Sequence, residues 1–272
     1  MIDGQIKKMH TVLGSPVEYS LPIGDELIAL NPYLGKRIKL SYLGEIGCSN
    51  CGKKTKKSYS QGFCYPCMRK LAQCDLCIMK PETCHYHLGT CREPEWGDSH
   101  CFQDHYVYLA NSSGLKVGIT RHTQVPTRWI DQGATQALQI FKVKTRLQSG
   151  QVEIALKQHV GDKTDWRKML KGSAEPKNLE EERDKLLALG ADALKEISAM
   201  NPEGDIELLP NAEPVTITYP VLEYPTKVSS LNFEKTPDIE GVLLGIKGQY
   251  LILDTGVLNI RKFTSYHIRF DG

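Results

Sequence analysis

The sequence predicts an α+β fold made of three parts, and two observations support this prediction. All nine cysteines fall between Cys48 and Cys101, so one segment is set apart from the rest of the chain. Elsewhere, alternation of apolar and polar residues indicates β-strands, whereas apolar residues at helical spacing are concentrated between residues 126 and 200. We therefore expect a zinc-cluster module, a three-stranded sheet with helices, and a small β-rich unit.

The order of these parts follows from the local patterns. Residues 1–46 carry short apolar runs broken by glycine, proline and asparagine, which predict two or three short strands. The zinc-binding module is expected over residues 47–104, and an α/β unit with a trailing helix over residues 105–200. A β-rich unit is expected over residues 201–272, and the N-terminal strands are candidates to complete it.

Within the α/β unit the predicted elements follow one another closely. They are strands over HYVYLA (105–110) and LKVGI (115–119) joined by a turn at 111–114, a short helix over PTRWIDQG, a strand over 137–145 and a helix over 152–160. The stretch TDWRKML predicts a further short helix with Thr164 as its N-cap, and residues 178–200 predict one longer helix. Turn formers over 201–214 indicate a linker, and the pattern is β from Val215 onward.

The composition excludes several classes of protein. A hydrophobic content of 40% and a charged content of 24% are ordinary for a globular protein, and a net charge of +2 indicates no partner. The N-terminus lacks the apolar run of a secretory signal, and no stretch is apolar over the length of a membrane span. We expect a cytoplasmic location and no membrane partner, and the sequence shows no motif for a small-molecule cofactor.

Two cysteine pairs have the spacing of a zinc site. In a reducing cytoplasm cysteines bind metal more often than they form structural disulfides. Cys48-x-x-Cys51 and Cys64-x-x-Cys67 can each supply two thiolates from a tight knuckle, and two knuckles complete a tetrahedron around one zinc ion. Polar neighbours such as Asn50 argue against four buried hydrophobic cysteines. We therefore predict a structural zinc ion at these four residues.

A second zinc ion is the preferred interpretation of the remaining cysteines, but its ligands stay open. Cys77, Cys84, Cys91 and Cys101 form a workable quartet, and Cys74 with Cys77 is an alternative pair. The further candidates in this region are His85, His87, His100 and His105. Reduced, buried cysteines without metal are the competing interpretation.

Basic and aromatic residues surround the cysteines. The cations are Lys53, Lys54, Lys56, Lys57, Arg69, Lys70, Lys80 and Arg92. Tyr59, Phe63 and Tyr65 lie among them. Lysine and arginine contact phosphates and aromatic faces stack on bases, which favours nucleic acid, DNA or RNA, as a partner. A solvated charged loop is the alternative.

The stretch HYVYLANSSGLKVGIT resembles the paired motifs of the GIY-YIG nuclease superfamily, in particular its phage-type branch. Val107-Tyr108 corresponds to the Ile-Tyr of the first motif, and Lys116-Val117-Gly118 corresponds to the second. Arg128 falls where a helical arginine is expected, and Glu153 falls where a helical glutamate binds a divalent ion. The predicted order of strands and helices over residues 105–160 agrees with this family.

The resemblance implies metal-assisted hydrolysis of a phosphodiester. Tyr108 would orient or deprotonate the attacking water, and Arg128 would neutralise charge in the transition state. Glu153 would hold one Mg²⁺ ion, and Lys116 would contact phosphate. Two positions depart from the motif, because Tyr106 stands where glycine is usual and Lys116 replaces the second tyrosine.

The whole chain also resembles an uncharacterised bacterial family known only as a domain of unknown function. The segments TCREPEWGDSHC, KVGITR, RWIDQGA and GIKGQYLIL carry this likeness. Three functional hypotheses result: a zinc-containing nucleic-acid-binding protein that is a magnesium-dependent endonuclease, a non-catalytic RNA- or ribosome-associated binder, and a zinc-stabilised scaffold for protein interactions.

Overall fold

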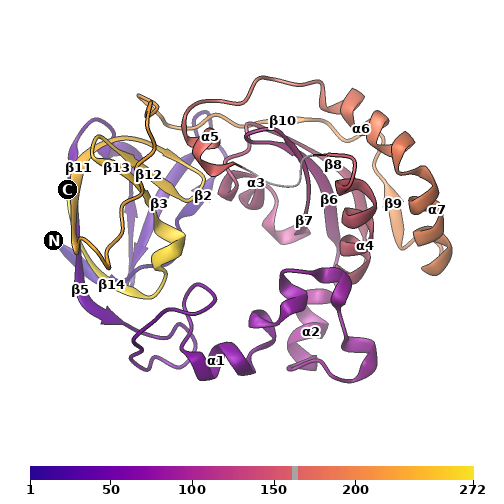
Figure 1. The fold of residues 1–272 in the computed structure, drawn as a ribbon, viewed down its shortest axis with the longest axis horizontal. Coiled ribbons are helices and arrows are strands. Elements are labelled where there is room, and N and C mark those ends of the chain that lie inside the picture. The colour runs from indigo at the N-terminus through magenta and orange to yellow at the C-terminus, as the bar shows by residue number, and fades with distance from the viewer. Residues whose placement is uncertain (161–164) are drawn as a thin grey trace.

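The computed structural model describes residues 1–160 and 165–272 and contains three antiparallel sheets. The largest sheet consists, in spatial order, of β1 (Ile2–Gln5), β14 (Tyr266–Asp271), β5 (Arg37–Ile46), β11 (Asp238–Lys247), β12 (Tyr250–Leu253) and β13 (Gly256–Asn259). A small sheet consists of β2 (His10–Val12), β3 (Glu18–Ile23) and β4 (Glu26–Ala29). Strands from the two ends of the chain therefore pair in one β-rich unit (Figure 1).

The third sheet is the centre of the α/β unit. Its strand order is β10 (Val215–Thr216), β8 (Gln136–Val143), β6 (His105–Asn111) and β7 (Leu115–Arg121), and β9 (Ile206–Leu208) also pairs with β8. The unit contains the helices α3 (Thr127–Asp131), α4 (Arg146–Lys157), α5 (Trp166–Leu170), α6 (Leu179–Leu189) and α7 (Ala191–Met200), with the 3-10 helix η6 (His122–Gln124). The α+β prediction is confirmed.

Alternate residues of β6 face two different cores, because successive side chains of a strand point to opposite faces. Tyr108 and Ala110 belong to the large core of the β-rich unit. Val107 and Leu109 belong to a second core, together with residues of α4, α6 and α7. The central strand of the α/β unit is therefore covered on both faces, which explains its nearly continuous apolar sequence.

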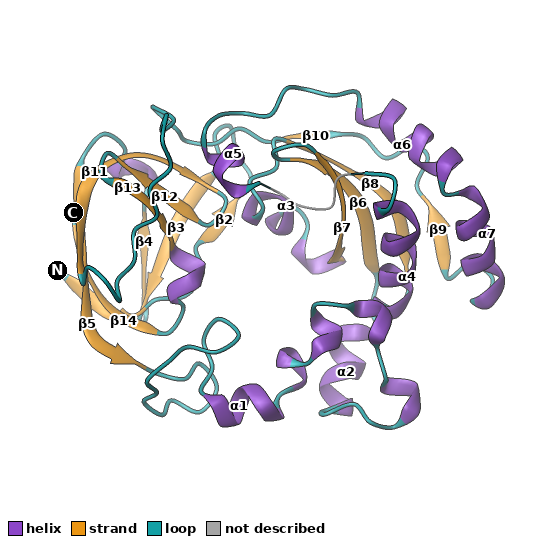
Figure 2. Ribbon diagram, viewed as in Figure 1, coloured by secondary structure: helices purple, strands orange, loops and turns teal. Residues whose placement is uncertain are grey.

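The cysteine-rich segment runs between the two larger units along the lower side of the molecule (Figure 1). Short helices and loops dominate it (Figure 2). Its helices are α1 (Tyr65–Lys70), η2 (Ala72–Cys74), η3 (Leu76–Ile78), η4 (Pro81–Thr83), η5 (Tyr86–Leu88) and α2 (Pro94–Cys101). Two further 3-10 helices, η1 (Asn31–Tyr33) and η7 (Ile260–Phe263), lie in the β-rich unit.

Several predicted boundaries were wrong. Residues 1–46 contain five strands rather than two or three, because turns at glycine and proline divide them more finely. The predicted linker 201–214 contains β9, which pairs with β8. The predicted helix over 178–200 is two helices separated at Gly190. A side chain at Gly190 would come within 3.0 Å of Leu156 on α4, so the two helices meet α4 at a small residue.

Two helix starts also differ from the prediction. Helix α4 begins at Arg146, well before the predicted start, because Thr145 and Gln148 form a capping box. Gln148 N donates to Thr145 Oγ1 at 3.2 Å, and Thr145 N donates to Gln148 Oε1 at 2.9 Å. Helix α5 is capped by Asp165, and the predicted cap Thr164 lies outside the described residues.

Candidate functional site

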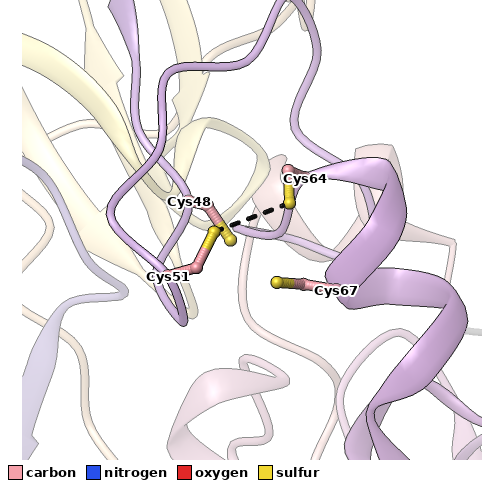
Figure 3. A group of neighbouring side chains, drawn as sticks. All are labelled: Cys48, Cys51, Cys64 and Cys67. Atoms are coloured by element: carbon pink, nitrogen blue, oxygen red, sulfur yellow. Dashed lines mark hydrogen bonds between the residues drawn. The ribbon is translucent and has the colours of Figure 1, made fainter.

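Four cysteines of the first pair of knuckles converge at the junction between β5 and α1. Their sulfur atoms all lie within 4.8 Å of one another (Figure 3). The Sγ atoms of Cys51 and Cys64 are 3.8 Å apart. Four sulfurs bound at about 2.3 Å to one tetrahedral zinc ion are separated by about 3.8 Å. Cys48, Cys51, Cys64 and Cys67 therefore form a four-cysteine cluster compatible with zinc.

The local backbone forms this cluster from two tight turns. Gly52 N donates to Cys48 O at 2.9 Å, which closes the first turn, and Cys48 N donates to Lys53 O at 2.9 Å. Cys64 is the residue before α1, and its carbonyl accepts from Met68 N at 2.9 Å. Each C-x-x-C pair thus places both of its sulfurs on one side of its turn.

The electrostatics of the cluster are compatible with a bound cation. Burial raises the pKa of Cys48, but backbone N–H groups of Cys64, Cys51 and Asn50 outweigh it and lower the pKa to about 6. The Asn50 amide lowers the pKa of Cys67, but burial and the neighbouring thiols raise it to about 12. Four adjacent thiolates cannot all ionise without a positive charge between them, and Zn²⁺ supplies that charge.

The first cluster is anchored to the β-rich unit. Ser49 Oγ and Ser265 Oγ are 2.6 Å apart, and Ser265 Oγ donates to Gly62 O at 2.9 Å. Arg261 Nε donates to Gln61 Oε1 at 2.6 Å. The loop that joins the two knuckles is therefore held against η7 and the start of β14.

The later cysteines form a second group. Cys77, Cys84, Cys91 and Cys101 line one cavity of about 20 Å³, and Asp75 and His85 also border it. The donor atoms of Asp75, Cys77 and His85 lie within 4.8 Å of one another.

The other candidate ligands do not border this cavity. Burial raises the pKa of Cys74, and a hydrogen bond with Ser60, in the loop between the two knuckles of the first cluster, lowers it in part. His87 is exposed, and His100 stacks on Trp96 with ring centroids 4.2 Å apart. His105 is fully buried, and its Nδ1 lies 2.7 Å from Gln103 O.

Tyr108 lies at the centre of the α/β unit. Its side chain is fully buried, its hydroxyl donates to Gln132 Oε1 at 3.2 Å, and its ring contacts Trp129 edge-on. It faces Gly118 across the β6–β7 pair. A Cβ atom on Gly118 would lie 2.7 Å from the hydroxyl oxygen of Tyr108, so this position requires glycine.

Two of the residues singled out by the motif, Arg128 and Glu153, act electrostatically on Tyr108. Burial raises the pKa of Tyr108, the charge of Arg128 and the Gln132 hydrogen bond lower it in part, and Glu153 raises it further. Burial, together with the charge of Arg128, lowers the pKa of Lys116 to about 8. The structure thus brings together β6, β7, α3 and α4, the four elements that carry Tyr108, Lys116, Arg128 and Glu153.

The position of Glu153 in α4 excludes a stabilising interaction with the N-terminal end of the helix dipole. The helix predicted over 152–160 would place Glu153 in the first turn, where an acid interacts favourably with the helix dipole. Because α4 begins at Arg146, Glu153 lies in the helix interior. Asp131, three residues after Arg128 on α3, accepts from Lys8 Nζ at 2.7 Å and from Gln249 Nε2 at 2.8 Å.

The sequence reasoning missed two cations beside Arg128. Burial lowers the pKa of Arg261 and the positive charge of Arg128 lowers it further, whereas the negative charge of Asp131 raises it in part. Burial also lowers the pKa of Arg146, and Arg128 again contributes. Arg261 and Arg146 are far from Arg128 in the sequence, and neither belongs to a local motif. Only the three-dimensional arrangement could identify them.

A separate cavity of about 490 Å³ lies near β10, and Tyr219 and Tyr224 are among its lining residues. Lys247 is fully buried beside these rings, with its Nζ atom 5.4 Å and 5.3 Å from their centroids. Lys247 Nζ donates to Gly172 O at 2.9 Å. Burial lowers the pKa of Lys247 to about 8.

Among the helices of the described residues, none is both long and apolar enough to cross a membrane.

Comparison with known proteins places these features in a family. Residues 35–268 match the family described as "Protein of unknown function (DUF2797)". No curated protein and no solved structure matches the chain. The matched region contains both cysteine groups and the residues around Tyr108, and it covers most of the sequence. The chain therefore belongs to the DUF2797 family.

Proposed function

We propose that this protein binds nucleic acid through Lys116, Arg128 and Arg261, called here the basic cluster. The observation that carries this proposal is that Arg128 lies close enough to Lys116 and Arg261 for its charge to lower the pKa of both. The three cations come from β7, α3 and η7. The fold therefore concentrates positive charge where two units meet.

Concentrated like charge favours an anionic ligand. The charge of Arg128 opposes the charges of Lys116 and Arg261, although Asp131 offsets part of this repulsion at Arg261, and a bound phosphate group would add attraction. A phosphodiester backbone supplies regularly spaced negative charges and can contact all three cations at once.

The loop of the first cysteine cluster provides a second contact region. Tyr65 is 53% exposed and packs edge-on against Tyr59, with ring centroids 5.5 Å apart. Lys57 Nζ lies 5.5 Å from the Tyr59 ring centroid. An exposed aromatic ring beside lysines suits base stacking with simultaneous phosphate contact. Gln61 of this loop binds Arg261, which links this region to the basic cluster.

Cleavage of the bound phosphodiester is a second candidate function, favoured by Glu153. The carboxylate of Glu153 acts on the same buried phenol as Arg128. In addition, β6 lies between β7 and β8 in the sheet, and α4 follows β8 in the chain. A Mg²⁺ ion bound at Glu153 would polarise the phosphate and stabilise the leaving oxygen.

The chain's own residues would divide the remaining tasks. Arg128 would neutralise charge on the phosphate, and Lys116 would orient it. The Tyr108 phenol is fully buried and its pKa is raised, so it stays protonated near neutral pH. Tyr108 would therefore position Arg128 and Gln132 instead of deprotonating water.

The experiment measures binding first and cleavage second. The zinc-loaded full chain is titrated into fluorescently labelled single- and double-stranded DNA and RNA, and anisotropy is recorded without magnesium. Mg²⁺ is then added, and products are resolved on a denaturing gel. We expect wild type to bind, Glu153→Gln to bind without cleaving, and Arg128→Ala to lose affinity.

Each outcome has a distinct meaning. Binding without cleavage by wild type would reject the nuclease and leave a non-catalytic RNA- or DNA-binding protein. If the zinc-loaded protein binds none of the four polymers, nucleic-acid binding is rejected and the zinc-stabilised protein scaffold becomes the better hypothesis. The matched control is Arg37→Ala, which removes an exposed arginine paired with Glu240 on β5 and β11.

A further inference from the structure

The cavity between η3 and α2 has the size and lining of a metal site. Cys77 belongs to η3, Cys84 follows η4, Cys91 follows η5 and Cys101 ends α2. All four border the same cavity of about 20 Å³. A space of this size accommodates about one small particle such as a water molecule or a metal ion. We propose that these four cysteines hold a second structural zinc ion, and that Cys74 remains a free thiol.

The competing donor set is Asp75, Cys77 and His85, but its carboxylate is already engaged. Asp75 Oδ1 accepts from Leu76 N at 2.6 Å and thereby caps η3. Asp75 Oδ2 accepts from Arg92 Nε at 2.7 Å. A metal ion at this carboxylate would compete with the arginine and with the cap. Four thiolates would supply a complete tetrahedral set for zinc without breaking either interaction. Unlike the sulfurs of the first cluster, these four do not all lie within 4.8 Å of one another, so they would have to close around the ion.

A buried arginine balances the charge of this centre. Four thiolates around Zn²⁺ carry a net charge of about −2. Arg146 lies close enough to Cys101 and Cys77 for their charges to act on its guanidinium. Its Nη2 donates to Ile78 O at 2.6 Å, and its buried Nε has no hydrogen-bond partner among the described residues. A thiolate bound to metal would provide an acceptor and a counter-charge for a cation that is otherwise expensive to bury.

The second centre also supports helix α4. The backbone of Gly150 packs directly on η4, because a Cβ atom there would lie 2.7 Å from both Glu82 N and Pro81 Cβ. Arg146 and Gly150 both precede Glu153 on this helix. The zinc-bound segment would therefore fix α4 in place. Any effect of this second centre on phosphate chemistry at Glu153 rests on the proposed function. The metal site itself does not depend on that function.

The test is the metal content of the purified full chain, measured by inductively coupled plasma mass spectrometry. We expect two zinc ions per wild-type chain. Cys84→Ser and Cys91→Ser should each contain one fewer, whereas Cys74→Ser is the matched control and should retain both. Cys51→Ser should lose the ion of the first cluster and keep the second. Because Cys84→Ser could fail to fold, Cys84→His offers a nitrogen ligand and should recover the second ion.

Two results would overturn the proposal. One is a folded wild-type chain that contains a single zinc ion, which Cys51→Ser removes. The other is loss of the second ion in Asp75→Asn together with its retention in Cys84→Ser and Cys91→Ser, which would assign it to the carboxylate set. Neither result depends on whether the protein binds or cleaves nucleic acid.

Discussion

The salt dependence of nucleic-acid binding tests the basic cluster most directly, and Arg128→Ala is the decisive substitution. Arg128 is half-buried on α3, and its charge reaches both Lys116 and Arg261. Removing it deletes the cation that the other two cluster residues share as a neighbour. The variant should bind more weakly, and its affinity should depend less on salt.

The magnitude follows from the number of phosphate contacts. Each neutralised phosphate contributes about −0.7 to the slope of log K against log salt for a single strand, and about −0.9 for a duplex. Three cations therefore predict a minimum slope of about −2 for single strands and about −3 for duplexes. Raising salt from about 50 to about 200 mM should weaken these contacts about 20-fold and about 40-fold, respectively. Arg128→Ala should reduce the slope by about 0.7 to 0.9.

Fluorescence anisotropy at four or more salt concentrations measures the slopes of wild type and variants. Arg37→Ala changes the net charge equally, but Arg37 is an exposed residue paired with Glu240 at 3.3 Å in the β-rich unit. This control should leave the slope unchanged. An Arg128→Ala slope equal to that of wild type, or an equal loss in Arg37→Ala, would show that the basic cluster does not contact phosphate.

Three further predictions concern stability. Chelation of zinc should abolish hydrogen-exchange protection over residues 47–104 and spare the β-rich unit. The described residues of this segment belong to none of the hydrophobic cores, and a structural zinc ion contributes on the order of 10 kcal/mol; persistent protection in the metal-free protein would contradict the zinc assignment. The unfolding free energy of wild type should rise between about pH 8 and about pH 10.5, and the Lys247→Met variant should not show this rise. The unfolded chain binds more protons in this window, and the drop in the pKa of Lys247 from 10.5 to about 8 corresponds to about 3 kcal/mol. Parallel curves of unfolding free energy against pH for wild type and variant would refute this reasoning. Gly118→Ala should cost about 1–3 kcal/mol in urea denaturation, because the new methyl group overlaps Tyr108. The cost should shrink in a Tyr108→Phe background, and an undiminished cost would place the strain elsewhere.

Elements with strong local signals could be predicted from the sequence. The β6–β7 hairpin was predicted because apolar runs flank a turn of asparagine, serine and glycine. The first cysteine cluster was predicted because each C-x-x-C pair forms its half of the site within four residues. The start of α4 was missed because the apolar residues at helical spacing begin only at Val152, after Ser149-Gly150. Gly150 is instead helical, and its lack of a side chain permits close contact with η4.

Ligand choice in the second cysteine group could not be deduced from spacing. Cys74 and Cys77 form a C-x-x-C pair in the sequence, yet of the two only Cys77 borders the cavity. The 3-10 helix η3 starts between the two residues, so they do not share one regular turn. The neighbours of Arg128 were equally inaccessible, because η7 approaches α3 only through the packing of the β-rich unit on the α/β unit.

The sequence by itself determined the features that depend on a few consecutive residues: the knuckles at Cys48 and Cys64, the hairpin that presents Tyr108, and the segregation of cysteines from apolar cores. Tertiary structure decided the features that depend on residues far apart in the chain. These are the pairing of N-terminal with C-terminal strands, the cysteines that share the second cavity, and the approach of Arg261 to Arg128. The physical reason is that local turns and caps are set by hydrogen bonds within a few residues, whereas shared cavities and like-charge contacts arise only when separate elements pack together.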